Sequence, residues 1–206
     1  MDQSTLNKLK RRVLEISFKH KLSHLGSCLT ALPIIVEIYE ERKENEPFIL
    51  SSGHAGLGLY VVLEHFEGHD AEMLFNLHGV HPNRDLEHGI YCSTGSLGQG
   101  LPIAVGMALA DRNKNVYCLI SDGECSEGSI HEAIRIKNEQ QLRNLKIYLN
   151  FNGWGAYKQI QSVGVDINDI IYRETTSDYL PFLIGQDAHY HCMTEEECKQ
   201  GLEVLR

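Results

Sequence analysis

The sequence lacks the features that mark several large classes of protein. Its six cysteines are scattered and form no Cys-x-x-Cys pair, so neither a zinc site nor a disulfide scaffold is expected. No signal peptide or membrane-spanning apolar run is found. Lys and Arg number 19 against 28 Asp and Glu, and no basic patch is present. With a net charge of −9, a nucleic acid is not an expected partner, because binding a phosphate backbone requires a basic face.

What remains is the composition of an ordinary globular protein. The chain has 206 residues, of which 42% are hydrophobic and 23% charged. This length fits one domain over residues 1–206 and is enough to bury a substantial core. Because free thiols are typical of a reducing compartment, a cytoplasmic location is expected.

Strand and helix patterns alternate along the chain. Short apolar runs predict strands at 48–52, 116–120, 145–149 and 188–191. Helical spacing predicts helices at 6–16, 30–41, 57–66, 70–77, 101–110, 130–141 and 167–172, and a capping box predicts another from Thr194. In the second helix Thr30 is the expected N-cap, with Pro33 in the first turn. The alternation favours an α/β fold with a doubly wound, mainly parallel sheet and helices on both faces.

The stretch Ser121-Asp122-Gly123 is the centre of the predicted site. It closes the apolar run 116–120 and comes just before a helix, while the next strand leads to Asn152. Both strand ends are expected at the same edge of the sheet, where open α/β folds bind ligands. Asp122 and Asn152 offer oxygen atoms, which Mg²⁺ and Ca²⁺ prefer, and diphosphate oxygens would complete the coordination shell.

Each of these features also has a plain structural interpretation. An Asp-Gly pair after a strand is most often an ordinary turn, and only its pairing with Asn152 and several histidine turns favours a function. His24, His54 and His81 lie in glycine or proline turns, where capping is the alternative to substrate contact. The glycines at 95, 98 and 100 either allow tight packing or bind an anion, and they do not form a dinucleotide fingerprint. The remaining histidines considered are expected at the surface (His20, His65, His69, His78 and His88) or in the strand at 188–191 (His189 and His191).

Taken together, these motifs resemble the N-terminal, diphosphate-binding half of transketolase, and most closely the small subunit of transketolases split over two chains. The resemblance covers most of residues 5–160. The signature of thiamine diphosphate enzymes, Gly-Asp-Gly followed by an Asn, is present as Ser121-Asp122-Gly123 with 28 residues before Asn152. The other matching stretches are Ser23-His24-Leu25-Gly26-Ser27, Leu50-Ser51-Ser52-Gly53-His54-Ala55, His81-Pro82 and Ser93-Thr94-Gly95-Ser96-Leu97-Gly98-Gln99-Gly100.

The resemblance implies a role for each matching residue. Asp122 and Asn152 would bind Mg²⁺ (or Ca²⁺) through their side chains, and Trp154 through its carbonyl. Other residues would contact or flank thiamine diphosphate: Gly95, Ser96, Leu97, Ser121, Gly123 and Glu127, with an N–H from Gly123 to the diphosphate and Glu127 at an interface between cofactor sites. His24, His54 and His81 would face the substrate and exchange protons near pH 7.

Several positions depart from the family pattern. Ser121 replaces a glycine, which adds a hydroxyl donor, and Trp154 replaces a smaller aliphatic residue. Asn150-Phe151 stands where an acidic pair or Asp-Arg is common, and Tyr91 where a glutamate is usual. Ser23 and Ser52 replace a glycine and a lysine.

The implied activity is transfer of a two-carbon ketol unit from a ketose to an aldose, as sugars or sugar phosphates. The glutamate that activates the cofactor's pyrimidine belongs to another domain in this family, so a C-terminal, pyrimidine-binding partner subunit is expected, in an α₂β₂ assembly. Two alternatives stay open: a subunit of another thiamine diphosphate-dependent lyase or 2-oxo-acid enzyme, and a non-catalytic cofactor-binding or scaffolding subunit.

Overall fold

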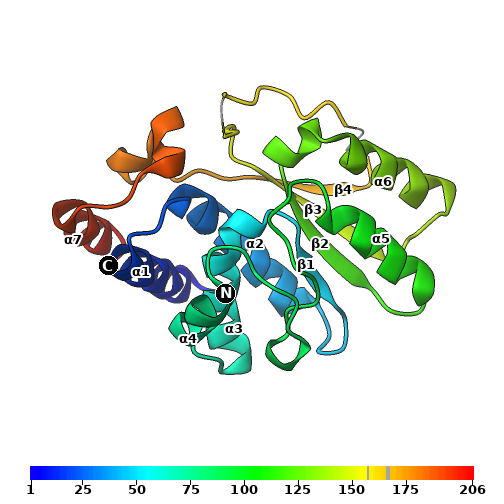
Figure 1. Ribbon diagram of the computed structural model, residues 1–206, viewed down its shortest axis with the longest axis horizontal. Coiled ribbons are helices and arrows are strands. Elements are labelled where there is room, and N and C mark those ends of the chain that lie inside the picture. Colours follow the sequence, from blue (N-terminus) through cyan, green and yellow to red (C-terminus); the bar gives the residue numbers. More distant parts are fainter. Residues whose placement is uncertain (157, 166–167) are drawn as a thin grey trace.

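Four parallel strands form one sheet at the centre of the molecule (Figure 1). They pair in chain order, as β1 (Phe48–Leu50), β2 (Val116–Ser121), β3 (Leu145–Phe151) and β4 (Ile170–Glu174). The computed structural model describes residues 1–156, 158–165 and 168–206.

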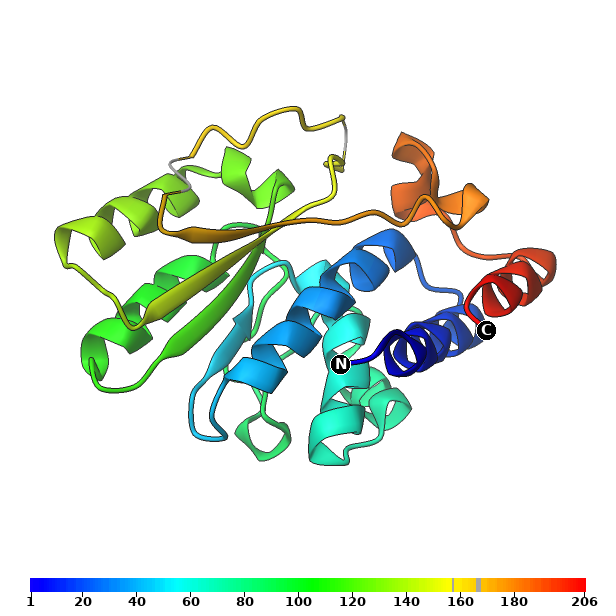
Figure 2. The ribbon, with the colours of Figure 1, turned by 180° about the vertical axis from the view of Figure 1, so that it is seen from behind.

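Helices cover both faces of this sheet, which confirms the predicted fold class (Figures 1 and 2). The helices are α1 (Gln3–His20), α2 (Leu25–Glu41), α3 (Gly56–Glu67), α4 (Ala71–His78), α5 (Gly100–Ala110), α6 (Gly128–Glu139) and α7 (Glu195–Val204). One face is covered by α2 and α3, with α1 and α4 beyond them, and the other by α5 and α6. Helix α7 packs on α1, where the Arg11 guanidinium donates to the Leu202 carbonyl.

The central strands supply side chains to both cores. In β2, Tyr117 and Leu119 join the core under α2 and α3, whereas Cys118 and Ile120 join the core under α5 and α6. Side chains alternate along a strand, and a parallel sheet that is covered on both faces buries both sets. This is why the two central strands are uninterrupted apolar runs in the sequence.

Glycines allow the turns at the carboxyl edge of the sheet to approach each other. A Cβ atom on Gly53 would lie 2.6 Å from the backbone nitrogen of Gly95. A Cβ atom on Gly100 would lie 2.6 Å from the Cα atom of Ser51, just beyond β1. Only residues without a side chain permit such contacts, so the turn at 93–100 is seated directly on the end of β1.

Two sequence-based predictions for helix α2 are wrong. The helix begins at Leu25 rather than Thr30, because Leu25, Cys28 and Leu29 belong to the apolar core. Thr30 is therefore not an N-cap but an interior residue, and its hydroxyl donates to the Ser27 carbonyl over 3.2 Å. Pro33 likewise lies inside the helix rather than in its first turn.

Near the C-terminus two further predictions are wrong and one is confirmed. Instead of a helix at 167–172 the chain forms β4, because Ile170 and Tyr172 face one core and Ile171 the other, as a paired strand requires; residue 167 is outside the described residues. Instead of a strand at 188–191 there is a 3₁₀ helix, η5 (Gln186–Tyr190). Helix α7 has the predicted capping box between Thr194 and Glu197.

None of the helices in the described part of the chain is long and apolar enough to cross a membrane.

The six cysteines are all free thiols, and only Cys192 is exposed.

Two glycines of α5 provide a matched test of this packing. We expect Gly100→Ala to lower the free energy of unfolding by about 1–3 kcal/mol, because the new methyl group meets the Cα atom of Ser51, which cannot move aside, and its side chain. Gly106→Ala should raise it by about 0.5–1 kcal/mol, because a Cβ atom there meets nothing within 4 Å and alanine favours the helix. Urea denaturation of both variants measures the difference, and equal effects of the two substitutions would contradict it.

Candidate functional site

The carboxylate of Asp122 joins the ends of β2 and β3. Its Oδ1 atom accepts a hydrogen bond from the Gly123 N–H at 2.8 Å. Its Oδ2 atom accepts from the N–H groups of Asn152 at 3.0 Å and Gly153 at 2.7 Å. The Asp122 N–H in turn donates to the Asn150 carbonyl at 3.0 Å. The two strand ends therefore converge as the sequence predicts, and the N–H of Gly123 is directed at Asp122 itself.

Helix α2 is tied to the same point through Thr30. The Thr30 hydroxyl oxygen accepts from the amides of Asn150 at 3.2 Å and Asn152 at 3.4 Å. The Asn150 side-chain oxygen accepts from the Thr175 hydroxyl at 2.5 Å. Asn150, which stands where the family commonly has an acidic residue, is buried with both ends of its amide bonded.

The oxygen atoms at this junction suit a hard divalent cation. Burial raises the pKa of Asp122, while its three N–H donors favour the charged form. The carboxylate has capacity for further contacts beyond these three bonds. Among the described residues, the Asn152 side-chain oxygen accepts one hydrogen bond, from the Trp154 N–H at 2.9 Å. Within the described residues, no group of three or more His, Cys, Asp or Glu side chains is arranged to hold a metal. The Asp122 carboxylate and the Asn152 amide oxygen, together with the Trp154 carbonyl expected from the sequence, fit a cation whose coordination shell is completed by oxygen atoms of a ligand.

A cavity of about 240 Å³ opens above the junction and brings together most of the predicted residues. Around Gly123 the space is open, since a Cβ atom there would meet nothing closer than 3.8 Å. The predicted residues that line the cavity are His24, His54, His81, Gly95, Leu97, Ser121, Asp122, Gly123, Asn152 and Trp154. Ser96 and Glu127 are exposed and are not part of the lining.

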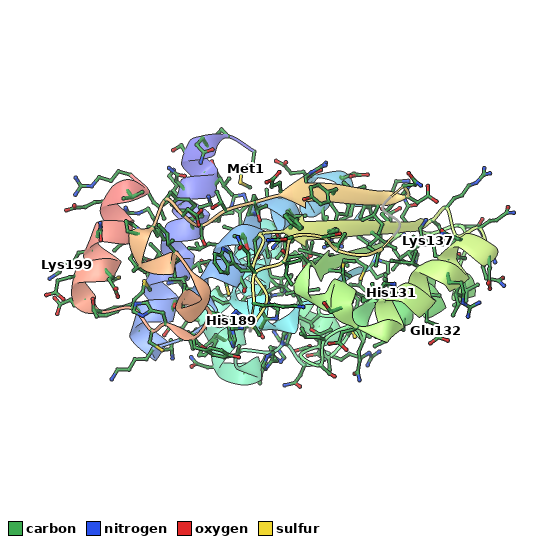
Figure 3. All side chains as sticks on the ribbon, turned by 90° about the horizontal axis from the view of Figure 1, so that it is seen from above. Met1, His131, Glu132, Lys137, His189 and Lys199 are labelled. Atoms are coloured by element: carbon green, nitrogen blue, oxygen red, sulfur yellow. The ribbon has the colours of Figure 1, made fainter. Side chains whose placement is uncertain are left out.

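Three histidine rings form one wall of this cavity. The ring centroid of His24 lies 5.6 Å from that of His54 and 4.4 Å from that of His189, and the last two are 5.9 Å apart. His189 belongs to η5, which returns along α2 so that the His24 N–H donates to the His189 carbonyl at 3.0 Å. Figure 3, which looks down from above the view of Figure 1, shows His189 beside the pale orange segment that carries η5.

His189 is a cavity-lining residue that sequence reasoning missed. It was predicted to lie in a strand, together with His191, but η5 turns it into the cavity instead. His191 points elsewhere and pairs with Glu197 at 2.8 Å. His78, predicted at the surface, has a side chain that is only 5% exposed.

His24 is held in a strained conformation at the start of α2. Its φ angle is +62°, in the left-handed region that few residues other than glycine adopt. Such strain costs on the order of 1–3 kcal/mol and persists where surrounding contacts hold it. The Nδ1 atom of His24 is buried and has no hydrogen-bond partner among the described residues.

The sequence predicts that His24 and His54 exchange protons near pH 7, but their surroundings lower their pKa values. Burial, and then the nearby His189 and His81, lower the pKa of His24 to about 4. Burial, and then the nearby His24, His189 and His81, lower the pKa of His54 to about 3. Burial also lowers the pKa of His189. In this structure His24 and His54 are neutral near pH 7 rather than divided between two forms.

A second, smaller cavity of about 40 Å³ adjoins the first. Ser27, Asn152, Trp154, Gly155 and His189 line both. The segment after β4 adds hydroxyl groups and a carboxylate from Thr176, Ser177 and Asp178. No lysine or arginine is found among the described residues that line either cavity.

A buried carboxylate, Glu124, was also missed. It does not line the cavity, and it accepts hydrogen bonds from three chain segments, at Ser51, Gly98 and Ser121. Its position directly after Ser121-Asp122-Gly123 was the only available signal.

Comparison with known proteins identifies the family to which the chain belongs. The family described as "Transketolase, thiamine diphosphate binding domain" matches residues 2–154. The chain is 33% identical over 166 residues to one of the subunits of the apulose-4-phosphate transketolase of Phocaeicola vulgatus, covering 70% of this chain and 58% of that one. It is 31% identical over 170 residues to the 6-deoxy-6-sulfo-D-fructose transketolase subunit SqwG of a Clostridium species, covering 73% and 62%.

A solved structure shows the same fold. Transketolase from Leishmania mexicana superposes with a TM-score of 0.64 at 22% identity, covering 76% of this chain and 28% of that one. The chain thus spans about three fifths of the two subunits it matches and a smaller part of the full-length enzyme. On the extent of the family match, the chain belongs to the thiamine diphosphate-binding domains of the transketolase family.

Proposed function

We propose that this chain is the cofactor-binding subunit of a transketolase-like enzyme, which transfers a two-carbon ketol unit from a ketose to an aldose using thiamine diphosphate and Mg²⁺ (or Ca²⁺). The observation that carries the proposal is the single cavity in which Asp122 and Asn152 lie below a wall of His24, His54 and His189. One end of the cavity offers oxygen atoms for a cation, and the other offers neutral imidazoles.

The junction residues would hold the cation and the diphosphate end of the cofactor. Asp122 and Asn152 would bind the cation through side-chain oxygens and Trp154 through its carbonyl, as in the family pattern. The bare backbone of Gly123 leaves room for the diphosphate. When bound, thiamine diphosphate supplies the carbon nucleophile and the electron sink for transfer of the two-carbon unit.

The histidines would bind the hydroxyl and carbonyl groups of the substrate. A neutral imidazole has one donor and one acceptor nitrogen, so it can donate a hydrogen bond to an oxygen atom or accept one from a hydroxyl group. His24 lines the cavity, and its Nδ1 atom has no partner among the described residues. His81 lies against the glycine turn, with ring atoms 3.0 Å from where a Cβ atom of Gly95 would be.

A second chain would complete the site. Two of the relatives are named as transketolase subunits, which supports assembly with a C-terminal, pyrimidine-binding partner, in the proposed form α₂β₂. The partner would supply the glutamate that activates the cofactor. It would also bind the phosphate of a sugar-phosphate substrate, since the described lining residues of both cavities include no lysine or arginine.

Reconstitution with the partner subunit tests the reaction. We expect transfer of a two-carbon unit between ketose and aldose phosphates that depends on added thiamine diphosphate and Mg²⁺, measured by product analysis. Release of CO₂ from 2-oxo acids without ketol transfer would favour the related lyase or 2-oxo-acid enzyme. A reconstituted pair that binds no thiamine diphosphate would overturn the proposal.

The Asp122 carboxylate provides a direct test of the cation site. Asp122→Ala should weaken Mg²⁺-dependent binding of thiamine diphosphate to the assembled enzyme about 100-fold, equivalent to about 3 kcal/mol, because it removes a charged ligand and the link to Asn152. Isothermal titration calorimetry measures the affinity. Asp111→Ala, at an exposed residue beyond α5, is the control and should bind normally. Unchanged affinity in a folded Asp122→Ala protein would contradict the assignment.

The neutral histidines predict how stability depends on pH. His54 stays neutral in the folded chain down to about pH 3, whereas an unfolded histidine takes up a proton as pH falls below about 6.5. The free energy of unfolding therefore decreases as pH falls from about 6.5 to about 3, by up to about 1.4 kcal/mol per pH unit for this group. Urea denaturation between pH 7 and 5 should show a shallower slope for His54→Gln than for His65→Gln, which replaces an exposed histidine of α3. Identical slopes would be evidence against a buried neutral His54.

A further inference from the structure

One buried carboxylate connects the segments that form the floor of the cavity. Glu124 lies in η3 (Gly123–Ser126), and none of its surface is exposed. Its Oε1 atom accepts hydrogen bonds from the Ser51 hydroxyl at 2.6 Å and the Gly98 N–H at 2.9 Å. Its Oε2 atom accepts from the Ser121 N–H at 3.0 Å. The Ser121 hydroxyl also donates to Oε2, at 3.5 Å. The three donor residues come from three different parts of the chain.

Each donor is close in sequence to residues that line the cavity. Ser51 follows β1 and comes three residues before His54. Gly98 belongs to the turn that carries Gly95 and Leu97. Ser121 ends β2 and comes directly before Asp122. Movement of any of these segments relative to the others would stretch a bond to Glu124, so its carboxylate fixes their spacing.

The turn at 93–100 depends on this contact more than the strands do. Gly98 has a φ angle of +76°, and its carbonyl accepts from the Ser129 hydroxyl at 2.8 Å. Gly98 is thus held through its N–H by Glu124 and through its carbonyl by Ser129. The strand end at Ser121, in contrast, is also held by pairing between β2 and β3.

The chemistry of the contact requires a carboxylate rather than an amide. Four donor groups from three residues converge on two oxygen atoms, and an ionised carboxylate accepts at both. Burial raises the pKa of Glu124, and these hydrogen bonds oppose that effect by favouring the charged form. A glutamine would place an NH₂ group against one of the donors and leave a buried N–H or hydroxyl group without an acceptor.

We propose that Glu124 is a positioning residue that holds the glycine turn at 93–100 at a fixed distance from the Asp122 loop, so that the two together accept the diphosphate end of the cofactor. This inference rests on the proposed function. Glu124 does not line the cavity and acts through the backbone of Gly98 and Ser121. Glu127, the glutamate singled out by family resemblance, is exposed and makes no comparable contact among the hydrogen bonds found in the described residues.

Amide hydrogen exchange tests the positioning without any cofactor. In the full chain, Glu124→Gln should increase exchange at the Gly98 amide by about tenfold or more, because the N–H loses a charged acceptor. Exchange at Leu119 and Ile147, in the paired strands, should change much less. Equal acceleration at all these amides would show a global loss of stability and overturn the proposal, as would unchanged exchange at Gly98.

Cofactor affinity tests the consequence. With the partner subunit and Mg²⁺ present, Glu124→Gln should weaken thiamine diphosphate binding by about tenfold at a temperature where the protein is fully folded, while Glu132→Gln on the exposed face of α6 should not. Wild-type affinity in Glu124→Gln would overturn the proposal.

A milder variant covers the case in which Glu124→Gln fails to fold. Ser51→Ala removes one of the four donor groups and should give smaller changes in the same direction at Gly98 and in affinity; no change in either would count against the proposal. If the wild-type complex binds no thiamine diphosphate, the proposed function fails, whereas the exchange measurement at Gly98 still decides whether Glu124 positions the turn.

Discussion

The fold depends on how the ends of two parallel strands are joined at Asp122. Asp122 is 1% exposed, and its carboxylate accepts hydrogen bonds from N–H groups of its own loop and of the chain leaving β3. Burial of a carboxylate is unfavourable, and the three hydrogen bonds offset that cost. Because Thr30 bonds to both Asn150 and Asn152, the same junction also fixes the start of α2 and therefore His24. One local arrangement thereby sets the distance between the proposed cation site and the histidine wall.

A second constraint is the direct contact between backbone segments. Gly53 and Gly100 let the turn at 93–100 sit against the end of β1 with no side chain between them. Glu124 then supplies the hydrogen bonds that such a closely packed, buried backbone needs, since an unpaired N–H would be costly there. Close approach and hydrogen bonding are complementary: the glycines bring the segments together, and the carboxylate fixes how they lie.

The sequence predicted those parts of the structure that local patterns specify. The strands β2 and β3 are apolar runs because both faces of a parallel sheet are covered, and Asp122 and Asn152 follow from where those strands end. The start of α2 was misjudged because Thr30 is a good capping residue in isolation, whereas packing of Leu25 and Cys28 extends the helix. His189 could not be found by spacing, since it reaches His24 only through the return of η5 along α2. Glu124 was missed for a similar reason, because two of its three partners, Ser51 and Gly98, are distant in the sequence.

The charge distribution in the cavity explains why the proposed cofactor would need a metal. The described residues that line the cavity include the Asp122 carboxylate and no lysine or arginine, and His24 and His54 are neutral. A diphosphate placed beside Asp122 would meet a like charge in a partly buried setting, where repulsion is weakly screened. A divalent cation bound between the two groups would reverse the sign of that interaction, because both would be its ligands. The proposed dependence on a cation therefore agrees with the electrostatics of the chain itself.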